Sequence, residues 1–205
     1  MPRKKVYRKK KTITDKRIAR VARNVFKRDT ETKVFDAYED VTVSTTGRVT
    51  LLTAVTQGVG VSQRVGERLQ PVALHLKFQS TVEPTDTYNN VRYIVFKWKD
   101  DDTLIAPVMA NVLGTTFGGL DEVLNEFQWT TRSNFQVLLD VTHSVDTAGP
   151  RSKITRHRLK LRGHIEYETN LTTGVGNIYL IRVSDSAVAP SPSMGVYSRL
   201  YFKDA

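Results

Sequence analysis

The sequence contains no cysteine among its 205 residues. Disulfide bonds, thiolate zinc sites and cysteine nucleophiles are therefore excluded, and the redox compartment is left undetermined. No apolar run approaches the ~18 residues that a membrane-spanning helix needs, and the N-terminus lacks the apolar segment of a secretory signal. No fixed-period repeat is present, which argues against a solenoid. We expect an intracellular product with one domain of roughly 170 to 180 residues plus an N-terminal arm.

Histidine is scarce as well, and no catalytic pattern is evident in the sequence. Of the four histidines, His157 and His164 are seven residues apart, a spacing that puts them on opposite faces of a continuous strand. A cupin enzyme instead needs two closely spaced histidines and a glutamate around one metal. The segment GTTFGG lacks the lysine of a phosphate-binding loop. Because no nucleophile, base and orienting group stand out together, we expect no enzymatic activity.

Positive charge is concentrated at the N-terminus. Residues 1–33 hold fourteen lysines and arginines against three acids, a net charge of +11; since the whole chain is +10, residues 34–205 have a net charge of −1. We expect residues 1–13 to be disordered until a polyanion neutralises them. Nucleic-acid binding is the favoured role of this arm (residues 1–30), and a solubilising or nuclear-localisation tail is the alternative. The predicted nucleic-acid-binding residues are Arg3, Lys4, Lys5, Arg8, Lys9, Lys10, Lys11, Lys16, Arg17, Arg20, Arg23, Lys27 and Arg28.

Apolar residues within the arm follow helical spacing. After Thr14 and Asp15, either of which can cap a helix, they recur at i, i+3, i+4, i+7 and i+8. These residues are Ile18, Val21, Ala22, Val25 and Phe26. The spacing predicts an amphipathic helix over residues 14–29. A helix of this length is marginal alone in water, so its apolar stripe needs a partner. The partner is the domain core or copies of the helix; a membrane surface is least favoured because the stripe has one aromatic residue and no leucine.

Beyond residue 33 the hydrophobic period changes from 3.6 to 2, which is typical of half-buried strands. Strands are expected near residues 33–44, 47–55, 68–80, 90–99, 134–144, 154–168, 177–184 and 196–203. The predicted core-facing sets are Val72, Leu74, Leu76 and Phe78; Phe135, Val137, Leu139 and Val141; and Leu159, Leu161, Ile165 and Tyr167. One short helix is expected through Leu120, Val123, Leu124 and Phe127. This pattern favours an all-β, eight-stranded antiparallel jelly-roll sandwich over residues 31–205.

Two strands carry features that a lone sandwich leaves unexplained. The stretch VRYIVFKW (91–98) is apolar on both faces, so its outer face needs cover from the helical insertion or from another subunit. The bases Arg156, Arg158, Lys160 and Arg162 share one face of their strand. Cross-strand pairing with acids is the favoured explanation for them, and contact with nucleic acid is the alternative.

Four stretches carry a resemblance: QGVGVSQRVGERLQPVALHLKFQ (57–79), VRYIVFKW (91–98), LLDVTHSV (138–145) and the terminal DA. In order and spacing they resemble the single jelly-roll capsid proteins of satellite necrosis viruses and of small circular Rep-encoding single-stranded DNA viruses. The most specific element is the Q-R-x-G turn of Gln63, Arg64 and Gly66. The resemblance implies a virion protein, made in the host cell, whose copies assemble into a sixty-subunit T=1 icosahedral shell around a single-stranded DNA or RNA genome. It further implies that the arm helices associate around threefold axes.

The resemblance also implies calcium at subunit interfaces. The family uses a glutamate before the first strand, the penultimate aspartate and carbonyls after the Q-R turn, and such oxygen ligands suit calcium. The matching positions here are Glu31, Asp204 and the backbone of Val65 and Arg68. Val59 replaces an acid of another family site, so we expect weaker calcium dependence. The run 100–102 of three aspartates is either a further oxygen cluster or a solvated loop.

Two alternatives of other classes stay open. One is a non-assembling protein that binds single-stranded nucleic acid and carries a β-sandwich domain. The other is a carbohydrate-binding sandwich with a basic tail.

Overall fold

The computed structural model describes residues 17–18, 20–21, 31–99, 106–114, 122–187 and 189–204. The chain divides into two units, Met1–Glu31 and Thr32–Ala205. In the first unit the described residues Arg17, Ile18, Arg20 and Val21 have helical backbone conformation. The predicted disorder of residues 1–13, the rest of the predicted helix and the aspartate run at 100–102 lie outside the described residues. Among the residues described, no helix is long and apolar enough to cross a membrane.

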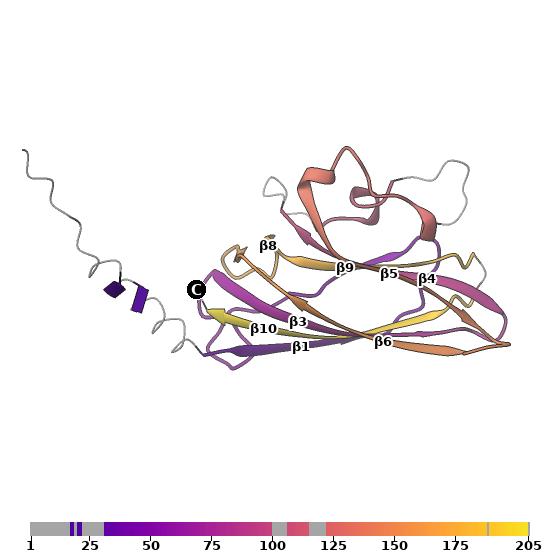
Figure 1. Ribbon diagram of the computed structural model, residues 1–205, viewed down its shortest axis with the longest axis horizontal. Coiled ribbons are helices and arrows are strands. Elements are labelled where there is room, and N and C mark those ends of the chain that lie inside the picture. The colour runs from indigo at the N-terminus through magenta and orange to yellow at the C-terminus, as the bar shows by residue number, and fades with distance from the viewer. Residues whose placement is uncertain are drawn as a thin grey trace, which may run out of the picture. The chain divides into compact units, whose positions relative to one another are not determined.

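The alternating sequences of the second unit form two antiparallel sheets (Figure 1). The strands are β1 (Lys33–Glu39), β2 (Arg48–Leu51), β3 (Arg68–Thr81), β4 (Tyr88–Trp98), β5 (Phe135–Asp146), β6 (Ser152–Lys160), β7 (Ile165–Tyr167), β8 (Gly174–Val175), β9 (Ile178–Ser184) and β10 (Ser193–Asp204).

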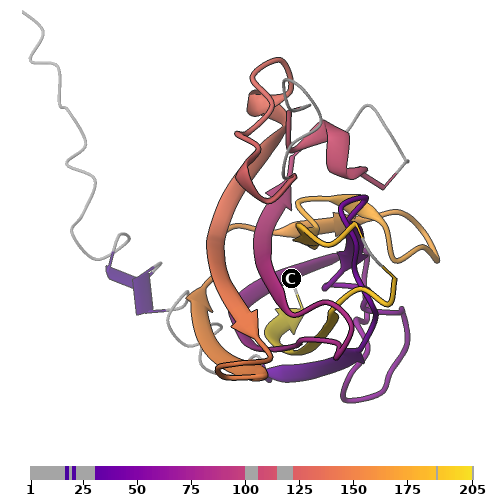
Figure 2. The same ribbon diagram turned by 90° about the vertical axis from the view of Figure 1, so that its right-hand side faces the viewer.

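The order of the strands within each sheet defines the fold. Apart from the short β7–β8 hairpin, one sheet runs β1-β10-β3-β6 and the other β2-β9-β4-β5. Successive strands therefore cross repeatedly between the two layers, which Figure 2 shows stacked face to face. This order is the double Greek key of a jelly roll. The predicted eight-stranded jelly-roll sandwich is confirmed.

The segment predicted as one strand over 154–168 is divided into β6 and β7. Gly163 adopts φ +85°, a backbone region that favours glycine and interrupts an extended strand. Both pieces still pair with β3, because Lys160 lies opposite Ala73 and Ile165 lies opposite Leu69. The segment therefore pairs with β3 on both sides of Gly163, but it is not one continuous strand.

The main core lies between the two sheets. It includes Leu74, Leu76 and Phe78 of β3 and Tyr93 and Val95 of β4, all almost fully buried. Burying each such side chain contributes about 1.5–3 kcal/mol. The alternation predicted for β3 and β4 is confirmed at these positions.

Val72 is the exception in β3, since its side chain is 40% exposed. The pairing with β10 shifts at this point: Tyr201 lies opposite Ala73, but the next residue, Phe202, lies opposite Pro71. This β-bulge makes Val72 an extra residue and turns it outward, while Ala73 is buried. The prediction that Val72 shares the core face of Leu74 is wrong.

A second bulge changes the face of β5. Leu139 lies opposite Val95, whereas Val137 lies opposite Phe96, so Leu138 is an extra residue. Leu139 packs against the core between the sheets, but Val137 packs against a separate apolar cluster. The prediction that all four listed β5 residues share one face is wrong, because a bulge reverses the alternation.

This separate cluster covers the outer face of β4. Ile94, Phe96 and Trp98 pack there with Val112 and Leu113 of the connection between β4 and β5. The connection lies over this sheet in Figure 1, and its described residues, 99, 106–114 and 122–134, include three one-turn 3-10 helices. They are η1 (Met109–Asn111), η2 (Glu122–Leu124) and η3 (Arg132–Asn134). Cover by the insertion, the first explanation for the two-faced strand, is confirmed.

The predicted helix in this connection is reduced to the single turn η2. Val123 is buried, but Leu124 is 75% exposed, and residue 120 lies outside the described residues. Arg92 of β4 anchors this turn, because its Nη1 donates to the carbonyls of Val123 (2.9 Å) and Asn125 (2.7 Å). The same guanidinium forms an ion pair with Asp140 of β5 (2.6 Å).

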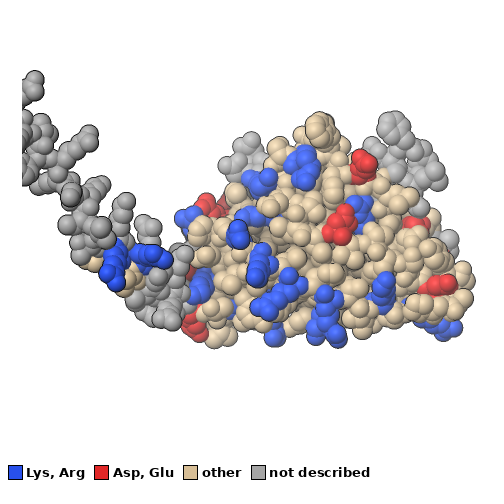
Figure 3. All heavy atoms as spheres, viewed as in Figure 1, with Lys and Arg blue, Asp and Glu red and all other residues tan. Residues whose placement is uncertain are grey.

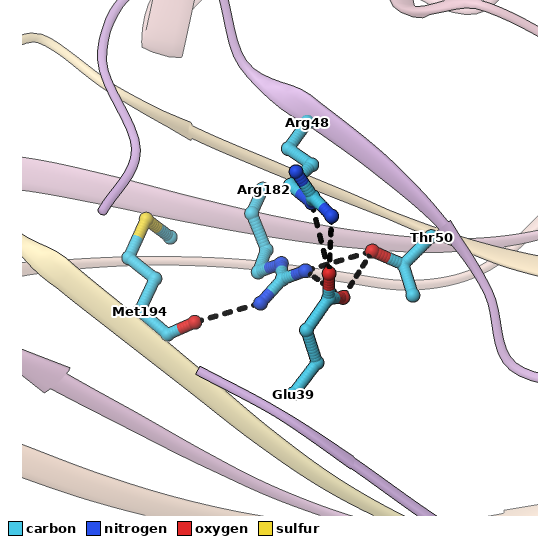
Figure 4. Close-up of polar contacts among 5 residues, drawn as sticks. All are labelled: Glu39, Arg48, Thr50, Arg182 and Met194. Atoms are coloured by element: carbon cyan, nitrogen blue, oxygen red, sulfur yellow. Dashed lines mark hydrogen bonds and ion pairs between the residues drawn. The ribbon is translucent and has the colours of Figure 1, made fainter. Parts of the chain in front are cut away.

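A polar cluster joins the two sheets at one edge (Figure 4). Arg182 of β9 is fully buried and donates to the Glu39 carboxylate of β1 and to the Met194 carbonyl of β10 (2.8 Å). Arg48 and Thr50 of β2 also donate to Glu39, at 2.9 and 2.7 Å. Burial alone would raise the pKa of Glu39, but the Thr50 hydrogen bond and the two guanidinium groups outweigh it and lower that pKa.

Candidate nucleic-acid interface

The structure describes only part of the predicted arm site. Of the thirteen predicted bases, Arg17 and Arg20 are described, and both are exposed. The apolar residues beside them are exposed as well, Ile18 by 63% and Val21 by 56%. The other arm bases lie outside the described residues.

Arg64 of the Q-R-x-G turn connects the loop before β3 to other parts of the domain. Arg64 is fully buried, and its guanidinium donates to the carbonyls of Val55 (3.3 Å), Gly66, Glu168 (3.3 Å) and Leu171 (2.8 Å). The guanidinium also lies 4.4 Å from the ring centre of Tyr167. Its charge is therefore stabilised by carbonyl dipoles and an aromatic face, and its contacts connect the loop before β3 to the loop after β7.

The predicted calcium ligands only partly come together. The Val65 amide donates to Asp204 Oδ1 (3.1 Å), and the Lys33 ammonium lies 2.8 Å from Asp204 Oδ2. Lys33 also donates to the Gln63 carbonyl (2.9 Å). Asp204 and the Q-R turn are therefore adjacent, as the resemblance implies, but an ammonium group lies between them.

The other two predicted ligands are the backbone of Arg68 and the Glu31 carboxylate. Leu69, the residue after Arg68, lies opposite Asp204 in the strand pairing, and the Arg68 side chain pairs with Glu166 (3.2 Å); Glu31 does not belong to the unit Thr32–Ala205. Nor do the described residues contain a group of three or more His, Asp or Glu side chains that could hold a metal. Because a lysine ammonium repels a divalent cation, Asp204 with Lys33 beside it does not fit calcium on its own.

The second basic row is where the structure differs most from expectation. Arg156, Arg158 and Lys160 are exposed and project from one face of β6, and Arg162 is exposed just beyond the strand end. Their β3 partners are Lys77, His75 and Ala73 respectively. None of the ion pairs found among the described residues includes these four bases. The favoured explanation, cross-strand pairing with acids, is wrong.

Further side chains extend this row onto neighbouring strands. Lys77 and His75 of β3 and Tyr197 and Arg199 of β10 lie on the same outer face. In Figure 3 the basic side chains are most frequent along the lower part of the domain, where this sheet lies in Figure 1. Alternation in the sequence could have placed each residue outward, but only strand pairing shows that they are neighbours.

The histidines do not form a catalytic or metal centre among the described residues. His143 of β5 is buried, and its Nε2 lies 3.1 Å from the Ser80 hydroxyl. Burial, assisted by the charges of Lys153 and His157, lowers the pKa of His143 to about 4. This histidine is therefore neutral at pH 7 and belongs to the core.

A two-layer jelly roll with a basic outer face and an N-terminal basic segment defines a single jelly-roll protein, a class that includes viral capsid proteins. The chain belongs to the satellite tobacco necrosis virus coat protein family, whose model matches residues 4–205. The chain is thus a member of a family of virion coat proteins, with a structural role.

The comparison with solved structures gives matches of low identity and low TM-score. A desmodium yellow mottle tymovirus chain is 11% identical, with 85% of this chain and 88% of that chain covered and a TM-score of 0.41. A cocksfoot mottle virus chain is 13% identical, with 86% and 96% covered and a TM-score of 0.36. No curated protein sequence matches the chain. The assignment rests on the family match; the resemblance to single-stranded DNA virus capsids stays a prediction.

Proposed function

We propose that this coat protein assembles into a sixty-subunit T=1 shell and packages a single-stranded genome through its basic arm. The observation that supports this most is the match to the coat-protein family over residues 4–205, which includes both the arm and the jelly roll. The family establishes the class of protein, and the charge distribution supports the division of labour between its two parts.

The arm charge has the right magnitude for packaging. Residues 3–28 hold thirteen bases and one acid, a net charge of +12. Sixty such arms would carry about 720 positive charges and balance on the order of a thousand nucleotides, one phosphate each. Neutralisation of this kind needs no base recognition, so binding should be independent of sequence and should weaken steeply as salt rises.

The exposed apolar stripe supports assembly as well. Ile18 and Val21 need burial for the helix to be stable, and like helices from neighbouring subunits are the proposed partners. Calcium at the interfaces stays a weaker proposal, because Lys33 already neutralises Asp204 and any ion there would need ligands from another subunit.

The test is assembly of the full chain with and without residues 1–28. Purified full-length protein should form uniform closed particles in negative-stain micrographs, with a 260/280 nm absorbance ratio that indicates nucleic acid. The deletion should keep the sandwich folded, judged by circular dichroism, but remove the nucleic acid. Particles of the truncated protein with full nucleic-acid content would contradict the role of the arm.

Further measurements on the full-length and truncated proteins separate the remaining classes. A chain that stays monomeric at every salt and protein concentration, yet retards single strands, would be a non-assembling binding protein. Glycan binding that survives the deletion would instead indicate a carbohydrate-binding sandwich. Nuclease digestion of nucleic acid recovered from native particles would identify DNA or RNA.

A further inference from the structure

We propose that the outer face of β1, β10, β3 and β6 is a second site for single-stranded nucleic acid, separate from the arm. The site would stack bases on tyrosine rings and contact phosphates with lysines and arginines. This inference rests on the proposed function, since the packaged strand is the occupant. We call this surface the basic face, defined by Lys77, Arg156, Arg158, Lys160 and Arg199 together with Tyr38 and Tyr197.

Strand register places one row of the basic face directly across four strands. Tyr38 of β1 lies opposite Tyr197 of β10, which lies opposite Lys77 of β3, which lies opposite Arg156 of β6. Neighbouring strands are about 4.8 Å apart, so this row alternates within a short distance from aromatic rings to cationic groups. Tyr38 is 71% exposed. Its ring is therefore available to a ligand.

A second row lies two residues further along the same strands. Asp36 of β1 lies opposite Arg199 of β10, which lies opposite His75 of β3, which lies opposite Arg158 of β6. Because side chains two residues apart on a strand share a face, this row is about 7 Å from the first. Lys160 follows in the same direction along β6. The two rows therefore place cationic side chains over a continuous area of the sheet.

An open groove runs over these rows. A hollow of about 510 Å³ is lined by Tyr38, His75, Lys77, Tyr197 and Arg199. A second hollow of about 250 Å³ adjoins it, because it shares Tyr38, Lys77 and Tyr197, and it extends to β6. The surface is therefore concave where the aromatic and cationic groups meet.

Charge selects the class of occupant. The five bases of the basic face meet one acid within the two rows, Asp36, which pairs with Arg199 at 2.7 and 2.8 Å. The bases Arg156, Arg158 and Lys160 have no ion-pair partner within the described part of the chain. Residues 34–205 have a net charge of −1, so this excess of positive charge is local to the face. A polyanion is the complementary ligand.

The aromatic rings distinguish a single strand from other polyanions. The Lys77 ammonium lies 5.6 Å and the Arg199 guanidinium 5.8 Å from the ring centre of Tyr197. Tyr197 is half-buried, and Tyr38 beside it is exposed. Aromatic rings beside cations in a positively charged groove are the combination by which proteins bind single strands without sequence preference. A second copy of the same face is disfavoured, because it would bring like charges together.

The test measures binding of full-length protein to a labelled oligouridine by fluorescence anisotropy across a salt series. The variant Arg156→Ser/Arg158→Ser should bind about tenfold more weakly and lower the salt slope by roughly 1.4, at about 0.7 per lost phosphate contact. The matched control Lys99→Ser/Arg151→Ser removes two exposed bases away from the basic face and should bind as wild type.

The stacking component has its own variants. Tyr38→Ser/Tyr197→Ser should weaken binding about tenfold or more, from roughly 1–3 kcal/mol per stacked base, with the salt slope unchanged. Tyr38→Phe/Tyr197→Phe keeps the rings and should bind nearly as wild type. Thermal unfolding of each variant confirms that the domain is intact.

The outcomes separate this site from the arm. If deletion of residues 1–28 removes packaging while every basic-face variant binds like wild type, the second site is overturned and the proposed function stands. If the wild type neither assembles nor binds, both fail. If the basic-face variants lose assembly but bind oligouridine normally, the face is a contact between subunits, which also overturns the proposal.

Discussion

The substitution Glu39→Gln tests whether the polar cluster in Figure 4 holds the two sheets together. Glu39 is the only carboxylate on the fully buried Arg182 within the described residues, and its side chain is 24% exposed. Removing one partner of a fully buried ion pair costs about 3–5 kcal/mol. Because Glu39 is partly hydrated and the Met194 carbonyl still accepts from Arg182, we expect about 3 kcal/mol. For a chain of this size, that lowers Tm by roughly 6–12 °C.

The assay is thermal unfolding of wild type and variant at equal protein concentration, since assembly stabilises the fold by mass action. The control Glu166→Gln breaks the exposed pair with Arg68, whose side chains are 59% and 52% exposed, and should cost less than about 1 kcal/mol. The lowered pKa of Glu39 means that its contribution is complete above the unfolded pKa of about 4.3 and is lost as the pH falls through the folded value. The two Tm values should therefore converge in acid. A Glu39→Gln shift no larger than that of the control at pH 7 would refute this account.

Three further predictions concern His143, Arg64 and the Lys33–Asp204 ion pair. Because the pKa of His143 is lowered to about 4, the free energy of unfolding should fall by up to about 3 kcal/mol as the pH falls from 6.5 to 4. The variant His143→Gln should remove this pH dependence, measured by urea unfolding; an equal dependence of stability on pH in wild type and variant would contradict the prediction. Arg64→Lys should lower stability by about 2–4 kcal/mol, because lysine supplies neither the fork of donors nor the contact with Tyr167; an unchanged urea midpoint would oppose this. EDTA should leave wild-type particles intact, because Lys33 already neutralises Asp204. The variant Lys33→Met removes this ion pair and should make the particles less stable; disassembly of wild-type particles by EDTA would support interface calcium instead.

Local patterns in the sequence predicted the strands because the face on which a residue lies depends mainly on its own neighbours. Leu74, Leu76 and Phe78 alternate in the sequence and are buried together. The same reasoning failed at Val72 and Val137. Bulges at these places arise from pairing with β10 and β4, strands remote in sequence, so no local pattern marks them.

The candidate sites divide in the same way. The charged arm is evident from composition, because net charge needs no partner to be counted. The role of Arg64 is not evident from composition, because the carbonyls that accept its hydrogen bonds belong to residues as distant in sequence as Leu171. The bases of β6 could be grouped by alternation, but the expectation of acidic partners failed because the pairing of β6 with β3 placed Lys77 and His75 beside them.

By itself the sequence determined the separation of a cationic arm from a nearly neutral β domain, and the succession of strands from which a jelly roll could be expected. Periodicity and charge are properties of neighbouring residues, so they can be read along the chain. The tertiary structure alone decided which strands are adjacent, where bulges reverse a face, and that Lys33 lies against Asp204. These features depend on long-range pairing, which places residues far apart in the sequence within a few ångströms of each other.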